Sequence, residues 1–83
     1  MRNTLEPEIQ NRIISNIKYM LERDGMSQSA LAIEIDRNVS HLNSILNGRV
    51  NPTIEVLINV AKFYKITLDE LIFTDMAEAK KVR

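Results

Sequence analysis

The first 25 positions alternate between apolar and polar residues with the period of an amphipathic helix. Branched aliphatic residues recur every four positions, at Leu5, Ile9, Ile13, Ile17 and Leu21. Pro7 falls in the expected first turn, where proline is tolerated, and Thr4 is the expected N-cap. Gly25 is expected to end this helix as a left-handed cap residue.

Two shorter helices are predicted next, over about 28–35 and 39–46, with Ser27 and Asn38 as their N-caps. Their apolar positions are Leu31, Ala32 and Ile35 in the first, and Leu42, Ile45 and Leu46 in the second. Only about three residues separate the two helices, so they must cross steeply, as in a helix-turn-helix unit.

Two more helices follow the Asn51-Pro52 pair, which disfavours helix. Thr53 is expected to cap the fourth helix. The inward-facing positions of this helix are expected to be Ile54, Leu57, Ile58 and Ala61, with Tyr64 as a further candidate for the same face. Thr67 and Glu70 form a capping box that opens a short fifth helix through Phe73. With no strand pattern, the fold is predicted to be all-α, one domain over 1–83 with a polar tail at 74–83.

Composition excludes several classes of protein. The 83 residues include no cysteine and one histidine, so disulfides, thiolate metal sites and a nucleophile–base pair are not expected. Neither a glycine-rich phosphate loop nor metal-ligand spacing occurs, so we expect no enzyme, metal or cofactor. The apolar runs are far shorter than the roughly 20 residues of a membrane helix, and the N-terminus is too polar for a secretory signal, so a cytoplasmic protein is expected.

Charge is balanced overall but unevenly placed. Eleven basic and eleven acidic residues cancel, which counts against nucleic-acid binding because many such domains are basic. However, residues 38–48 contain no carboxylate, and Arg37 and Arg49 stand at either end. The predicted third helix can therefore approach phosphates without repulsion.

The outward face of that helix consists of small amides and hydroxyls: Ser40, Asn43, Ser44 and Asn47, with His41 beside them. Such groups suit the reading of base edges in a major groove. The alternative is an ordinary solvent-exposed face, although such faces usually carry lysine and glutamate.

A set of landmarks along the chain resembles the lambda-repressor-like DNA-binding domains of the Xre/Cro family. They are Ser27-Gln28, Leu31-Ala32, Leu42, Ile45, Asn47-Gly48, Asn51-Pro52 and Leu68-Asp-Glu-Leu71. The resemblance covers about 13–73 and implies a five-helix bundle with the helix-turn-helix at its second and third helices.

The chain departs from the family pattern at two places. Asp36 stands where the family usually has a turn glycine, so a left-handed and slightly strained aspartate is expected. Leu21 and Leu46 occupy the positions of a partly buried arginine–glutamate pair in many members. Since both charges are replaced together, neither is stranded in the core, and we predict that the two leucines touch.

The resemblance also implies roles for individual residues. Base readers would be Val39, Ser40 and Ser44 with Asn43 beside them; asparagine can contact adenine bidentately, and valine a thymine methyl. Gln28, at the start of the second helix, would hold a phosphate. Further backbone contacts are expected from Asn38, His41, Asn47, Arg49 and Asn51, with helix capping as the alternative for Asn38 and Asn47. Arg37 has the alternative of pairing with Glu34 or Asp36.

The fifth helix region is richer in apolar residues than one short helix needs. We predict that some of Ile66, Leu68, Leu71, Ile72 and Phe73 form a two-fold dimer contact, as in many relatives; the alternative is that all are core.

The leading hypothesis is a sequence-specific transcriptional regulator that binds double-stranded DNA as a homodimer. Two recognition helices about 34 Å apart would enter successive major grooves of an inverted repeat. The alternative is a protein-interaction module of the same fold with little DNA affinity. Phage repressors, restriction–modification controllers and antitoxins share this layout, and a toxin, an antirepressor or RNA polymerase are candidate protein partners.

Overall fold

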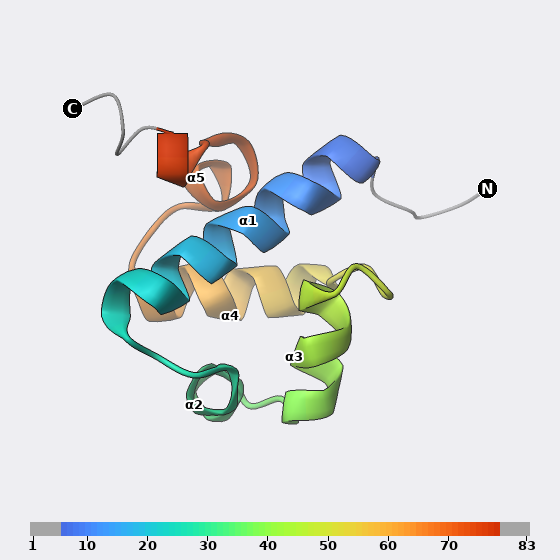
Figure 1. Cartoon of the computed structure of the whole chain (residues 1–83), viewed down its shortest axis with the longest axis vertical. Coiled ribbons are helices and arrows are strands. Elements are labelled where there is room, and N and C mark those ends of the chain that lie inside the picture. The colour runs from blue at the N-terminus through green and yellow to red at the C-terminus, as the bar shows by residue number, and fades with distance from the viewer. Residues whose placement is uncertain (1–5, 79–83) are drawn as a thin grey trace.

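The computed structural model describes residues 6–78 of the chain, which contain five complete helices, a helical turn at 76–78 and no strand. The helices are α1 (Pro7–Asp24), α2 (Gln28–Glu34), α3 (Val39–Leu46), α4 (Ile54–Tyr64) and α5 (Leu68–Phe73) (Figure 1). Figure 1 shows α1 and α4 running across the middle, with α2 and α3 on one side of α1 and α5 on the other. The prediction of an all-α fold is confirmed.

The helix ends follow from local capping. Ser27, Asn38, Thr53 and Thr67 each accept a hydrogen bond from the amide three residues ahead, and Glu70 completes the capping box. Gly25 ends α1 in the left-handed conformation, as predicted, with φ of 62°. The expected cap Thr4 lies outside the described residues, and α1 begins at Pro7 with Glu6 as its N-cap.

All five helices contribute to one apolar core. Its fully buried aliphatic residues include Ile13, Ile17, Leu31, Leu42, Ile45, Val60 and Leu71. Leu21 and Leu46 are both buried in this cluster. Direct contact between the two leucines stays a prediction.

The expected inward face of α4 is partly wrong. Ile54 is 62% exposed and Ile58 is 39% exposed, whereas the buried residues are Val56, Leu57, Val60 and Ala61. Both sets have helical spacing, so periodicity alone does not choose between them. Packing in the bundle selects the two valines and leaves two isoleucines at the surface.

A buried asparagine on α1 fastens the end of α5. The Nδ2 of Asn16 donates to the carbonyl oxygens of Leu71 and Thr74, both at 2.7 Å, and its Oδ1 accepts from the Met76 amide at 3.1 Å. Arg12 donates to the Phe73 carbonyl oxygen at 3.2 Å. The last carbonyls of a helix have no partner within it, so α1 supplies the partners that α5 lacks.

Replacing Asn16 with leucine should therefore lower the free energy of unfolding by about 2–4 kcal/mol, because it leaves buried carbonyl oxygens without donors. Urea denaturation measures this change. Asn11→Leu, at an exposed position of the same helix, is the matched control and should stay within about 0.5 kcal/mol of wild type. Equal losses for the two variants would contradict the role of Asn16.

Tyr64, at the end of α4, is held by its ring rather than by its hydroxyl. The ring packs edge-on against Phe63 with centroids 4.9 Å apart, and the Arg23 guanidinium lies 5.9 Å from the Tyr64 centroid. Its hydroxyl is buried and has no hydrogen-bond partner among residues 6–78. Burial raises the pKa of Tyr64 above its usual range.

We expect Tyr64→Phe to leave the free energy of unfolding unchanged or to raise it by up to about 1 kcal/mol, since it removes an unpaired buried hydroxyl. Folding favours the neutral phenol of the wild type. The free energy of unfolding of the wild type relative to Tyr64→Phe is therefore constant below the unfolded pKa of about 10 and falls as pH rises through the folded pKa. Urea titrations of both proteins between neutral and alkaline pH test both points. A loss well above 1 kcal/mol at neutral pH would show that the hydroxyl is bonded.

Candidate nucleic-acid interface

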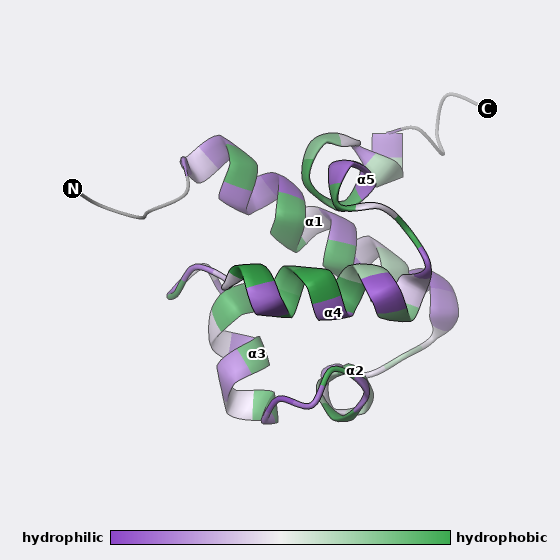
Figure 2. Cartoon of the chain, turned by 180° about the vertical axis from the view of Figure 1, so that it is seen from behind, coloured by the Kyte–Doolittle hydropathy of each residue, from purple (hydrophilic) through white to green (hydrophobic). Residues whose placement is uncertain are grey.

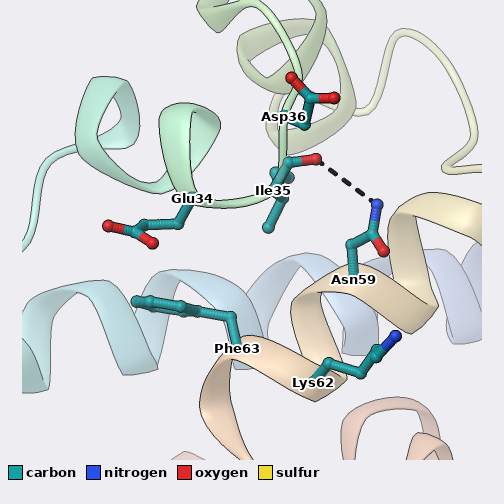
Figure 3. Close-up of a pocket in the computed structure, with 6 residues that line it drawn as sticks. All are labelled: Glu34, Ile35, Asp36, Asn59, Lys62 and Phe63. Carbon is teal, nitrogen blue, oxygen red and sulfur yellow. Dashed lines mark hydrogen bonds between the residues drawn. The ribbon is translucent and has the colours of Figure 1, made fainter.

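The turn between α2 and α3 sets the position of the third helix. Asp36 adopts the left-handed conformation with φ of 59°, as predicted, and the Arg37 amide donates to the Ala32 carbonyl oxygen at 2.9 Å. Asn59 of α4 donates to the Ile35 carbonyl oxygen at 3.5 Å, which ties the end of α2 to α4 (Figure 3). The turn is thus held from within and from α4.

Arg37 is engaged inside the molecule. Its Nη2 lies 2.9 Å from the Glu55 Oε1 on α4, and its Nη1 donates to the Asp36 carbonyl oxygen at 2.9 Å. The predicted alternative of a pair with Glu34 or Asp36 carboxylate is therefore wrong, because α4 brings a different carboxylate closer. With Arg37 paired, Arg49 is the arginine that borders the face of α3.

A hollow beside this turn is lined by Glu34, Ile35, Asp36, Asn59, Lys62 and Phe63 (Figure 3). It carries two carboxylates, and in Figure 3 that of Asp36 points away from the ring of Phe63, whereas that of Glu34 does not. Carboxylates repel phosphates, so this side of the turn is unsuited to a nucleic-acid backbone.

Substitution of Asp36 by glycine is expected to raise the free energy of unfolding by about 0.5–1 kcal/mol, because glycine has no Cβ to strain the left-handed backbone. Thermal or urea unfolding reports the difference. The same change in the first turn of α5, Asp69→Gly, is the control and should instead lower stability. A destabilised Asp36→Gly protein would mean that the aspartate side chain stabilises the turn.

The outer face of α3 is polar and open. Val39, Ser40 and Asn43 are exposed and Ser44 is half-buried, while Leu42, Ile45 and Leu46 are buried on the other side. One open hollow is lined by Val39, Ser40, Asn43, Ser44 and Arg49. The structure therefore brings all four predicted base readers together with Arg49.

Three side-chain amides form a chain across this face. Asn43 Nδ2 donates to Gln28 Oε1 on α2 at 3.1 Å, and Asn47 Nδ2 donates to Asn43 Oδ1 at 2.9 Å. Each bond uses one hydrogen or one lone pair of the Asn43 amide, which leaves one hydrogen and one lone pair free. Sequence reasoning singled out all three residues but not the bonds between them.

The other residues predicted to contact the DNA backbone differ in their exposure and in their hydrogen bonds within the chain. Asn38 caps α3 through its Oδ1, which accepts from the His41 amide at 2.7 Å, so its structural role is present. His41 is half-buried, and Arg49 is exposed in the loop after α3. Asn51 is half-buried, and its Oδ1 is buried without a hydrogen-bond partner among residues 6–78.

The predicted dimer residues separate into two groups. Leu71 is fully buried in the core of its own chain, so its assignment to a dimer contact is wrong. Ile66, Leu68 and Ile72 are half-buried and pack against that core, and Phe73 is 64% exposed. The hydrogen bonds of Asn16 hold the end of α5 against α1, so most of the apolar surface of α5 is buried within its own chain.

No group of three histidine, cysteine, aspartate or glutamate residues within 6–78 is placed to hold a metal ion. None of the five helices is long and apolar enough to cross a membrane.

A family model described as helix-turn-helix matches residues 17–71, which include all of α2, α3 and α4. The chain belongs to the Xre/Cro-like helix-turn-helix family. This family consists of DNA-binding regulators, which are typically not enzymes. No curated protein and no solved structure is similar enough to the chain to count as a match.

Proposed function

We propose that this helix-turn-helix protein is a sequence-specific transcriptional regulator of the cytoplasm that binds an inverted repeat in double-stranded DNA as a homodimer. The observation that carries the proposal is the outer face of α3, which is exposed, free of carboxylates and built around an amide held by two others. An eight-residue helix with its opposite face buried fits a major groove as the reading element of a helix-turn-helix.

Asn43 is the proposed reader of adenine. Adenine presents an acceptor at N7 and a donor at N6 in the major groove, and the free hydrogen and lone pair of Asn43 match these two groups. Val39 would contact a thymine methyl group, and the hydroxyls of Ser40 and Ser44 accept either donor or acceptor.

Gln28 is the proposed link between the bases and the backbone. Its Oε1 accepts from Asn43, so both Nε2 hydrogens remain for a phosphate oxygen. Gln28 is the first residue of α2, and the N-terminus of this helix, capped by Ser27, favours an anion. One residue thus positions the base reader and holds the backbone.

The remaining backbone contacts are proposed for Asn38, His41, Asn47, Arg49 and Asn51. Most of them are neutral, and Arg37 is neutralised by Glu55. Since the salt dependence of binding follows the number of phosphate charges neutralised, it should be shallow compared with that of a basic domain. Zero net charge favours one other function, a protein-interaction module of the same fold.

Selection of bound duplexes from a random pool tests the proposal, and we expect an enriched inverted repeat. Against that duplex, Asn43→Ala should weaken binding about 5- to 150-fold, measured by fluorescence anisotropy, because it removes a bidentate base contact. Its affinity for random DNA should not change.

Asn11→Ala, which removes an exposed asparagine from α1, is the matched control and should bind like wild type. Failure to enrich any duplex above the non-specific level would contradict DNA recognition and favour the protein-interaction module.

A further inference from the structure

Ile54 and Ile58, which the sequence pattern predicted to face the core, instead form an apolar edge on the surface of α4. Ile54 and Ile58 are one turn apart, and Val50, in the loop before α4, is 40% exposed. Figure 2 looks onto this outer side of α4, where hydrophobic and hydrophilic bands alternate along the helix. We name Val50, Ile54 and Ile58 the α4 edge.

We propose that the α4 edge is the contact with a second copy of this chain, with the two α4 helices antiparallel about a two-fold axis near Ile58. The inference rests on the proposed function for its homodimer and names the surface that forms it. The expected contact on α5 is thereby moved to α4.

Charge placement supports a second copy over other partners. Glu55 and Lys62 are seven residues apart on α4, at equal distances on either side of a midpoint beside Ile58, and both are exposed. In an antiparallel pair, residues on the same flank face each other across the axis. Glu55 uses Oε1 to pair with Arg37 of its own chain, so its Oε2 is the oxygen that would meet Lys62 of the other copy. A two-fold contact must be self-complementary, and this flank is.

The other exposed apolar side chains offer less. Ile33 on α2 is 77% exposed but lies beside the acidic Glu34, and single exposed isoleucines are normal. Phe73 is exposed on α5, where its half-buried neighbours pack inward. By contrast, the α4 edge continues directly from the loop that follows α3, so a contact there would set the distance between the two recognition helices.

Sedimentation equilibrium of the full chain without DNA tests the contact. We expect the wild type to form a dimer, and Ile58→Lys to raise the dimer Kd by about tenfold or more, because it places two like charges at the axis. Ile58 is partly exposed, so the variant should fold, which circular dichroism verifies. Ile33→Lys is the matched control and should dimerise like wild type.

A charge reversal tests the antiparallel arrangement. Lys62→Glu should raise the dimer Kd severalfold, since each copy then meets glutamate with glutamate, and Lys62→Gln, which removes the attraction without adding repulsion, should raise it less. Both variants keep the pair of Glu55 with Arg37. A Lys62→Glu protein that dimerises as tightly as wild type would overturn the arrangement.

Two further results would overturn the contact itself. One is a wild-type chain that stays monomeric at millimolar concentration. The other is a Phe73→Lys protein that becomes monomeric while Ile58→Lys remains dimeric, which would return the contact to α5. The duplex selection separates the two proposals: a dimer that selects no DNA contradicts DNA recognition and leaves this contact standing, whereas a monomer that selects DNA contradicts the homodimer and this contact and leaves DNA recognition standing.

Discussion

The structure depends on how α3 is held. A helix of eight residues is not stable in isolation, so its position must come from the rest of the fold. Leu42, Ile45 and Leu46 are buried on one side, and Asn38 caps the N-terminal end. Because these three side chains are buried in the core, the amide and hydroxyl side chains on the opposite face of α3 point outward.

The sequence alone was sufficient to predict the features that depend on interactions between residues close together in the chain. Ser27, Asn38, Thr53 and Thr67 were identified as caps because a cap bonds to an amide only three residues away. The left-handed Asp36 was predicted from the family resemblance, since it stands where the family usually has a turn glycine. The outward face of α3 followed from the spacing of its three buried residues.

What depends on contacts between distant helices was not predictable in this way. The two apolar stripes of α4 have the same period, and only the packing of the bundle buries Val56 and Val60 instead of Ile54 and Ile58. Asn16 binds residues more than fifty positions away. Its place beside Ile13 and Ile17 was the available signal, because a polar residue inside an apolar stripe needs a buried partner. The bond between Asn43 and Gln28 likewise required the crossing of α2 and α3.

The direction of the amide chain across α3 has a consequence for discrimination between purines. Guanine offers two acceptors in the major groove, so Asn43 would have to present two donors, or turn its oxygen away. Turning this amide alone would set oxygen against Gln28 Oε1 and nitrogen against Asn47 Nδ2. Reversing all three amides would instead aim the glutamine oxygen at a phosphate. On the proposed reading, the wrong base is therefore rejected by electrostatic conflict as well as by the loss of a good contact.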